Sequence, residues 1–287
     1  MSTVPPVAVV TDSTAYLPEG FAHRRSVTVV PLHALVDGAG GLDGADFGPA
    51  ELVSALAEHR LVTTSRPTPA ELVAAYQRVL DGGARSVVSV HLSRDLSGTW
   101  EAARLAAEEV GVDRVRVVDS RSTAMGLGFA TLAAAGAAAD GANAAEVERV
   151  ATDTASRTRT FFCLQTLEYL RLGGRIGPAT ALLGTALAVK PLLHVSGGRI
   201  EPLEKVRTTS RAVSRLVELA VDAAGDGDVG VAVHHLGTPE RAAELATQLA
   251  EKLPKSAGCL VSELGAVIGA HTGVGVLGVV ILPGGLG

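Results

Sequence analysis

The chain has 287 residues, which is enough for one large domain or two modest ones. Hydrophobic residues make up 47% and charged residues 19%, as is usual for a folded soluble protein. The net charge of −5 argues against nucleic acid or an anionic membrane as a partner, because both bind basic surfaces. Aromatic residues are only 3%, so a base-stacking surface is not expected either.

The cysteines and the N-terminus indicate a cytoplasmic protein. Cys163 and Cys259 are isolated, and the first residues, MSTVPPVAVVTDST, have no basic region and no cleavable signal pattern. Two uncharged runs, residues 122–139 and 176–189, are rich in Ala and Gly. Both fall short of the roughly 20 strongly apolar residues of a membrane span. We therefore expect two buried helices and no stable membrane insertion.

The first half of the chain alternates predicted strands and helices. Strands are expected at residues 7–10, 27–32, 86–92 and 114–118, and helices at residues 49–58, 69–80, 99–110, 122–139 and 143–158. Residues 37–48 are rich in Gly and Asp and are expected to form a loop. Thr68 precedes Pro69 and is expected to cap the helix that follows. This alternation predicts an N-terminal, doubly wound parallel sheet.

The second half has a different pattern. Strands are expected at residues 160–164, 191–195, 199–205, 229–234, 260–264 and 274–282, and helices at residues 166–172, 208–224 and 239–253. Ser196-Gly197-Gly198 between two strands predicts a hairpin, which requires an antiparallel pair. We therefore expect an α/β fold with two domains, residues 1–158 and 159–287, the second built on a mixed sheet.

The stretch from Ser86 to Val110 carries the densest set of polar groups. A buried strand leads into SRDLSGT, which contains Ser93, Ser97 and Thr99, and an amphipathic helix follows. The turn is thus expected at the carboxyl end of a strand, where ligands of α/β proteins bind. The start of the helix favours an anion. Part of these hydroxyls is equally explained by helix capping.

Several well-known catalytic motifs are missing from the sequence. GxSxG, GxxxxGK[ST] and HExxH are absent, so the chain shows neither a nucleophile elbow nor a P-loop nor a zinc-protease motif. His234 and His235 are adjacent in a strand, so we expect one to be buried and one to face solvent, with no metal site. Gly273 to Gly278 reads GxGxxG, but no helix follows it. We interpret it as a tight turn that is closely approached by other atoms, and we expect no cofactor.

Short motifs in a fixed order along the chain resemble the DegV family, bacterial fatty-acid-binding proteins. They are residues 10–14 (VTDST), 64–68 (TSRPT), 91–93 (HLS), 96–99 (LSGT), 118–120 (VDS), 167–170 (LEYL), 173–176 (GGRI), 190–191 (KP) and 269–273 (GAHTG). No single motif is decisive, but their order and spacing are specific. The resemblance covers almost the whole chain.

The resemblance implies two α/β domains with a long-chain fatty acid buried between them. It also implies that the carboxylate is held by Thr64, Ser93 and His271, with Ser65, Ser97, Gly98 and Thr99 nearby. The two Ala- and Gly-rich runs are suitable walls for the acyl chain, and close helix–sheet packing explains their small residues equally well. Met125, Leu127, Phe129, Ile176, Leu182 and Leu183 are the side chains expected to line such a slot.

The resemblance further implies a partner, a fatty acid kinase that converts the bound acid to acyl-phosphate for phospholipid synthesis. The chain is then a carrier and not an enzyme. Arg171, Arg175 and Arg207 are the residues expected to dock the kinase. Two positions depart from the family: Arg94 stands where many relatives have a second serine, and Trp100 stands where Tyr is common.

The alternative hypothesis is a serine-dependent enzyme that acts on a small anionic or acyl substrate. Ser93 or Ser97 would be the nucleophile, because both lie on a strand–turn–helix segment. Its weakness is the general base: His91 is the only nearby histidine, and the sequence indicates no group to orient it.

Overall fold

The structure, a computed structural model, describes residues 5–182 and 189–286 and divides into two compact units. Unit 1 comprises the described residues through Leu32 together with Ser65–Arg157. Unit 2 comprises His33–Thr64 and the described residues from Thr158 onward. The sequence-based division at residue 158 therefore differs at residues 33–64, which pack with the second half of the chain. They do so because their helix contacts a helix near the C-terminus.

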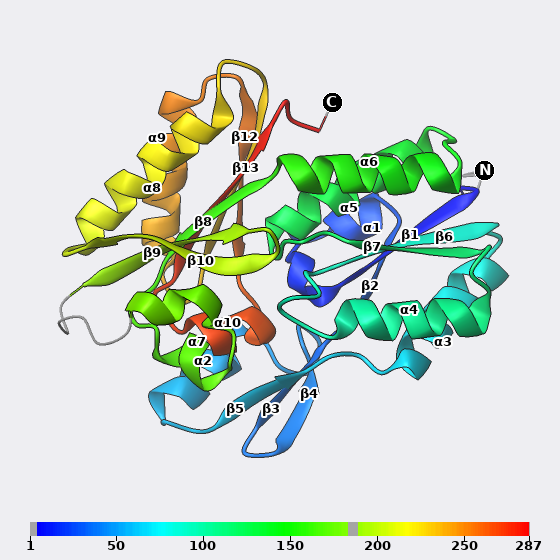
Figure 1. Cartoon of the computed structure of the whole chain (residues 1–287), viewed down its shortest axis with the longest axis horizontal. Coiled ribbons are helices and arrows are strands. Elements are labelled where there is room, and N and C mark those ends of the chain that lie inside the picture. Colours follow the sequence, from blue (N-terminus) through cyan, green and yellow to red (C-terminus); the bar gives the residue numbers. More distant parts are fainter. Residues whose placement is uncertain (1–4, 183–188, 287) are drawn as a thin grey trace. The chain divides into compact units, whose positions relative to one another are not determined.

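Unit 1 is built on a parallel sheet with helices on both faces (Figure 1). Its strands are β1 (Val7–Asp12), β2 (Val27–Val30), β6 (Ser86–His91) and β7 (Val115–Asp119), in the order β2-β1-β6-β7. Its helices are η1 (Ser13–Ala15), α1 (Phe21–Arg24), α3 (Pro69–Asp81), α4 (Thr99–Val110), α5 (Met125–Ala139) and α6 (Ala144–Arg157). All pairings are parallel, which confirms the predicted doubly wound sheet.

The two faces of this sheet form two separate cores because successive strand residues point to opposite sides. Val10 and Val87 pack against α3 and α4, together with the buried Tyr76. Val9 and Val88 pack against α5 and α6 on the other face. Thr68 caps α3 as predicted: its Oγ1 accepts from the N–H of Glu71, whose carboxylate accepts from the N–H of Thr68.

Unit 2 contains a six-stranded mixed sheet and a small three-stranded sheet. The large sheet has the order β10-β9-β8-β13-β11-β12, and the small sheet has the order β4-β3-β5. The strands are β3 (His33–Val36), β4 (Ala39–Leu42), β5 (Val62–Ser65), β8 (Arg159–Cys163), β9 (Lys190–Ser196), β10 (Arg199–Val206), β11 (Val229–His235), β12 (Ser256–Glu263) and β13 (Leu277–Pro283).

The helices of unit 2 are α2 (Pro49–Ala57), α7 (Glu168–Leu172), η2 (Gly177–Leu182), α8 (Thr209–Ala224), α9 (Pro239–Lys252) and α10 (Ala266–Thr272). Helices α8 and α9 lie side by side and cover the large sheet with Leu216, Leu245 and Leu249 (Figure 1). Strands β9 and β10 form the antiparallel hairpin predicted at Ser196-Gly197-Gly198. The predicted mixed sheet is confirmed.

One segment expected to be a loop contains a strand. Strand β4 pairs antiparallel with β3, and Val36 lies opposite Ala39. Between these residues Asp37 and Gly38 both have positive φ, 52° and 83°, as a type I′ hairpin turn requires. The Asp-Gly pair was the available signal, but Gly40 and Gly41 conceal the alternation of a strand.

The two Ala- and Gly-rich runs differ in secondary structure where the structure describes them. Helix α5 confirms the first, and Leu127 and Ala130 pack against the sheet, as close helix–sheet packing requires. The second expectation was a buried helix over residues 176–189, and it is corrected for the part that the structure describes, which excludes residues 183–188. Residues 177–182 form only the short 3₁₀ helix η2, in which Ala179 alone is buried, and the positive φ of Gly177 interrupts a helical path from Ile176. Leu183 lies outside the described residues.

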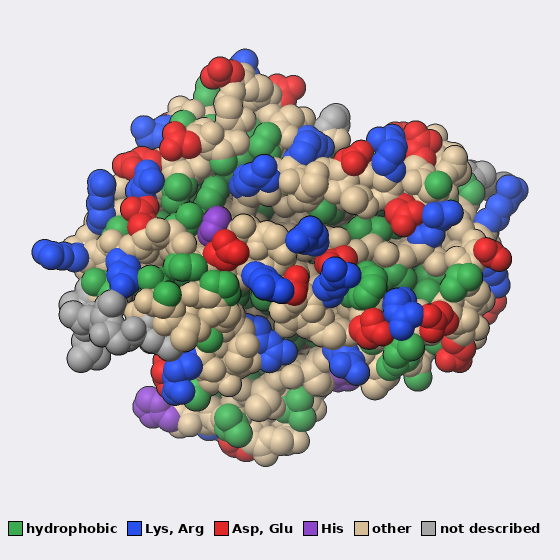
Figure 2. Space-filling view, viewed as in Figure 1, with side chains coloured by type: hydrophobic (Ala, Val, Ile, Leu, Met, Phe, Trp, Pro, Cys, Tyr) green, Lys and Arg blue, Asp and Glu red, His purple; other side chains and the backbone are tan. Residues whose placement is uncertain are grey.

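None of the helices in the described ranges is both long enough and apolar enough to cross a membrane. Acidic and basic side chains are interspersed on the face of the molecule seen in Figure 2. On helix α4, for example, Arg104 pairs with Glu101 and Glu108. Such exposed pairs contribute little to stability.

Candidate functional site

The Ser93 turn, residues 93–99, joins the end of β6 to the start of α4 in unit 1. Ser93 is fully buried, and its N–H donates to the carbonyl oxygen of Ser122 in the turn that follows β7 (2.8 Å). Its Oγ accepts from the N–H of Asp95 (3.2 Å). The two hydroxyl-rich turns are thus tied together at the carboxyl edge of the parallel sheet, where the sequence predicted the polar groups to meet.

Ser97, Gly98 and Thr99 form the start of α4. The Oγ of Ser97 lies 2.9 Å from the Oγ1 of Thr99 and accepts from its N–H at 3.3 Å. The N-cap residue of α4 is Gly98, so the Ser97 hydroxyl makes a local turn bond just before the helix, the kind of turn role that the sequence left open for these hydroxyls. The Arg66 guanidinium occupies the space that a side chain at Gly98 would fill. Arg66 therefore places a positive charge beside this turn, a role that the sequence analysis did not assign to it.

Thr64 and His271 are brought together in unit 2, as the resemblance implies. Thr64 lies on β5 and is half-buried, with Ser65 next to it and exposed. Its Oγ1 lies 2.9 Å from Nε2 of His271, which is on α10, 207 residues further along the chain. The other ring nitrogen, Nδ1, is buried and has no hydrogen-bond partner among the described residues.

Because the His271 ring is neutral, the Thr64–His271 pair has one hydrogen-bond donor that its own contact does not use. Burial, together with the positive charge of Arg175, lowers the pKa of His271 to about 4, so the ring is neutral at pH 7. A neutral imidazole has one N–H and Thr64 has one O–H, but the bond between them uses only one of the two hydrogens. The second hydrogen remains available to an acceptor, in a positive electrostatic environment.

Helix α10 is held in place by close packing and by a long-range cap. His271 packs so closely against Gly173 that a methyl group there would overlap its ring. Gly269 is packed in the same way against Leu52 of α2 and Leu236. At the start of α10, the N–H of Ala266 donates to Oδ1 of the buried Asp43 (2.8 Å). The segment 33–64 therefore supports both members of the Thr64–His271 pair.

The glycines 273 and 275 confirm the predicted tight turn. Both have positive φ, 74° and 85°, and side chains there would overlap the ring of Tyr169 and the side chain of Gln165. Gln165 also donates to the carbonyl oxygen of Gly275 (3.1 Å).

The three arginines expected to dock a partner have different environments. Arg171 is exposed and pairs with Glu168 one turn earlier on α7. Arg175 is half-buried, donates to the carbonyl oxygen of Gly173 (2.6 Å) and acts electrostatically on His271. Arg207 is exposed after β10. Arg175 is thus coupled to the Thr64–His271 pair, whereas Arg171 and Arg207 lie on the surface of unit 2.

The two residues that depart from the family, Arg94 and Trp100, contact each other. The Arg94 guanidinium lies over the Trp100 ring, 5.5 Å from the ring centroid, and its Nε is 3.5 Å from the carboxylate of Asp119. The Arg94 side chain is 63% exposed. The charge of Arg94 therefore interacts with Asp119 at the surface and with the Trp100 ring. The two residues that differ from the family are thus in contact with each other.

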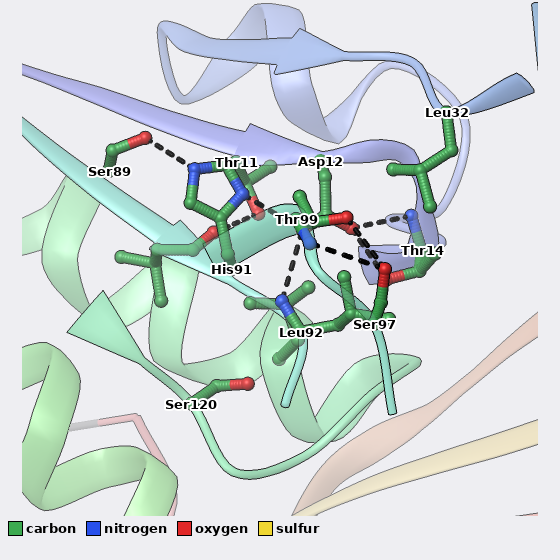
Figure 3. A network of polar contacts seen from close by, with 12 residues as sticks. Thr11, Asp12, Thr14, Leu32, Ser89, His91, Leu92, Ser97, Thr99 and Ser120 are labelled. Carbon is green, nitrogen blue, oxygen red and sulfur yellow. Dashed lines mark hydrogen bonds and ion pairs between the residues drawn. The ribbon is translucent and has the colours of Figure 1, made fainter. Parts of the chain in front are cut away.

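His91 has an orienting group that the sequence did not indicate. Its Nδ1 lies 3.0 Å from Oδ2 of Asp12, and its Nε2 lies 2.7 Å from Oγ of Ser89 (Figure 3). Both ring nitrogens are therefore engaged, and neither is placed to take a proton from Ser93 or Ser97. This geometry gives no support to the serine-dependent enzyme as the alternative function.

For the histidine pair in β11, the prediction of one buried side chain is confirmed and the prediction of one solvent-facing side chain is wrong. His234 and His235 are both buried, although one of them was expected to face solvent, because β11 lies between β13 and β12 in the sheet and also contacts α9. The Nδ1 of His234 is hydrogen-bonded to Ser262 (3.0 Å), and burial lowers its pKa to about 4. Within residues 5–182 and 189–286, no cluster of three or more metal-ligating side chains is present.

Comparisons with known proteins agree with the fold and the motifs. A model of the family described as "Uncharacterised protein, DegV family" matches residues 6–284. A DegV domain-containing protein of Streptomyces coelicolor is 52% identical over 275 residues, covering 96% of this chain and 98% of that protein.

Two solved structures are similar over almost the entire chain. One is a DegV family protein from Thermus thermophilus described for its fatty-acid binding, with 35% identity, a TM-score of 0.91 and coverage of 96% of this chain and 99% of that one. The other is DegV of Bacillus subtilis, described as a fatty-acid-binding protein, with 33% identity, a TM-score of 0.88 and coverage of 96% and 98%.

Proposed function

Because the chain belongs to the DegV family, we propose that it binds a long-chain fatty acid and acts as a carrier rather than an enzyme. The carboxylate is held by hydroxyl and imidazole donors, and the acyl chain is buried among apolar side chains. The acid is then presented in the cytoplasm to a fatty acid kinase for acyl-phosphate formation, a step that feeds phospholipid synthesis. No cofactor is required for this role.

The spare donor of the Thr64–His271 pair is the observation that carries the proposal. A buried carboxylate is costly unless it accepts hydrogen bonds. The pair has one hydrogen that its own 2.9 Å contact does not use, and Arg175 adds a positive charge nearby. An acceptor-only anion such as a carboxylate fits such a donor.

Ser93 is proposed as a second donor to the carboxylate. Its position at the strand edge of unit 1 is that of a ligand-binding residue in a doubly wound sheet. Ser65, Ser97 and Gly98 complete the proposed surroundings of the head group, with the Ser97 hydroxyl also accepting from the N–H of Thr99 at the start of α4.

The acyl chain contributes most of the affinity. Each buried methylene contributes about 0.8 kcal/mol, so a chain of about 15 methylenes gains on the order of 12 kcal/mol before the loss of its freedom is subtracted. Met125 and Phe129 of α5, together with Ile176 and Leu182, are the described side chains that we propose as its lining. The two residues from α5 are fully buried.

The test begins with the purified protein. Denaturing extraction followed by mass spectrometry should release a fatty acid, and delipidated protein should take up palmitate or oleate. Thr64→Val, His271→Ala and Ser93→Ala should each weaken palmitate binding by about tenfold, the worth of a hydrogen bond to a charged group. Glu101→Ala, an exposed change on α4, should leave it unaffected. Protein that is isolated empty and binds neither acid contradicts the proposal.

Docking of the kinase is tested separately with Arg171→Glu and Arg207→Glu. Both should reduce acyl-phosphate formation while palmitate affinity stays constant, whereas Arg175→Glu should lower both because Arg175 acts on His271. Arg241→Glu, an exposed charge on α9, serves as the control. Unchanged acyl-phosphate formation with Arg171→Glu and Arg207→Glu would place the docking surface elsewhere.

A further inference from the structure

A fully buried acid–imidazole pair in unit 1 has no part in the function proposed above. Asp12 at the end of β1 and His91 at the end of β6 each have 0% side-chain exposure. Figure 3 shows the His91 ring between Asp12 and Ser89. The hydroxyl of Tyr76, on α3, lies 2.9 Å from the Oγ of Ser89 and extends this line of contacts.

The hydrogen bonds of this network run in one direction. Burial raises the pKa of Tyr76, so its hydroxyl stays protonated and donates to Ser89. Ser89 has one hydrogen, and within the described residues its remaining neighbour is Nε2 of His91. The proton of His91 is therefore on Nδ1, where it donates to Asp12. The line ends on a carboxylate that accepts only.

The Asp12 carboxylate fixes the backbone immediately before Ser93. Its Oδ2 accepts from His91 and from the N–H of Leu92 (3.0 Å), and its Oδ1 accepts from the N–H of Thr14 (3.0 Å) and from the Thr14 hydroxyl. Four donors satisfy this buried charge. The residue that follows Leu92 is Ser93, so the same carboxylate determines where the Ser93 turn leaves the sheet.

A buried carboxylate with its imidazole is an expensive way to join two strands. Apolar side chains of similar volume often hold such a position at equal or greater stability. What the hydrogen-bond network adds is geometry: the carboxylate sits where four donors converge, and it leaves little freedom to the Leu92 N–H.

We propose that Asp12 and His91 are positioning residues that hold Ser93 in the geometry needed to donate to the head group of the bound acid. The inference rests on the proposed function and adds two residues to it. His91 does not touch the ligand. It acts through Asp12 and the backbone of Leu92.

The test compares two ligands with the same tail, palmitic acid and hexadecanol. The ratio of their affinities reports head-group recognition, whereas a general loss of packing weakens both. His91→Leu should lower this ratio by about tenfold with little change for hexadecanol. His91→Asn keeps an amide N–H at the position of Nδ1 and should restore most of the ratio. His23→Leu, an exposed histidine of α1, is the matched control.

Two results separate failure of the inference from failure of the proposed function. A wild-type preference for the acid that survives in His91→Leu overturns the inference alone. A wild-type protein without preference for the acid overturns the head-group site and the inference with it. If His91→Leu does not fold, Ser89→Ala takes its place: it removes the hydrogen bond to Nε2 and should lower the ratio about threefold. An unchanged ratio in Ser89→Ala overturns the inference.

Discussion

The Ser93 turn of unit 1 and the Thr64–His271 pair of unit 2 present the same kind of donor, but they are held in different ways. The Ser93 turn depends on hydrogen bonds, because the carboxylate of Asp12 gathers four donors around it. The pair depends mainly on packing: the His271 ring lies against Gly173, Gly269 of α10 lies against Leu52, and Nδ1 of His271 has no partner within the described chain.

This difference determines how each region can be broken. A hydrogen-bonded geometry fails when a partner is deleted, since the remaining buried groups lose their bonds. A packed geometry tolerates deletion better but fails when volume is added. Deletions in unit 1 and additions in unit 2 should therefore have the largest effects.

Asp12→Ala is expected to have the largest effect on stability. It leaves the N–H groups of Leu92 and Thr14 and the Nδ1–H of His91 without their acceptor, at about 3 kcal/mol or more in total. Urea unfolding measures the change. Asp153→Ala removes an exposed acid paired with Arg149 and should shift the free energy of unfolding by less than about 1 kcal/mol. Similar losses in both variants would contradict the role of the network.

Gly173→Ala should act by volume alone, because Gly173 has an ordinary φ of −75°. The added methyl group displaces the His271 ring and should lower palmitate affinity about tenfold, or about 1.4 kcal/mol. Isothermal titration of delipidated protein measures it. Gly136→Ala, in α5 with open space around it, should instead add about 0.5–1 kcal/mol of stability and leave affinity unchanged.

Asp43→Ala tests the cap that joins the segment 33–64 to α10. Loss of the 2.8 Å bond to the N–H of Ala266 should cost about 1 kcal/mol of stability. Because α10 carries His271, palmitate affinity should fall as well. Glu251→Ala, at an exposed position of α9, should change neither quantity. Retained affinity in Asp43→Ala would show that packing alone holds α10.

Mild acid is the smallest perturbation, and it acts on unit 2. The pKa of His271 is lowered to about 4, so the unfolded chain binds more protons than the folded chain between about pH 6.5 and pH 4. The contribution is fully present above pH 6.5 and is lost as the pH falls toward 4. From pH 7 to pH 6 the loss from His271 should be about 0.7 kcal/mol. Thermal unfolding of His271→Gln should show a flatter pH profile, and an unchanged profile would contradict the pKa shift.

Local patterns were sufficient for much of the fold. The apolar run at Val87–Val90, the Pro69 helix start and the Ser196-Gly197-Gly198 turn each predicted the element that is present. Helix α10 was not predicted, because its small residues show no polar face and Gly269 weakens its helical signal.

Less of the candidate site than of the fold could be predicted from the sequence, because the site depends on long-range contacts. Asp12 and His91 are 79 residues apart, and no local period indicates that β1 and β6 are neighbours. Thr64 and His271 are 207 residues apart and were paired only through the family resemblance. Assignment of residues 33–64 to unit 2 depends on contacts with α10, which appears near the end of the chain.

The packing of residues 33–64 with unit 2, although they lie within the sequence of unit 1, has a consequence for synthesis on the ribosome. Unit 1 has all its residues once residue 157 has emerged, but helix α10, which contacts α2 and β3, is made more than 100 residues later. Until α10 has been made, Leu52 lacks its contact with Gly269 and is less buried than in the folded protein. Apolar side chains exposed in this way on a nascent chain are bound by chaperones. The proposed head-group donors Thr64 and His271 can therefore meet only after residue 271 has been synthesised, long after the last residue of unit 1, so the proposed head-group site forms late.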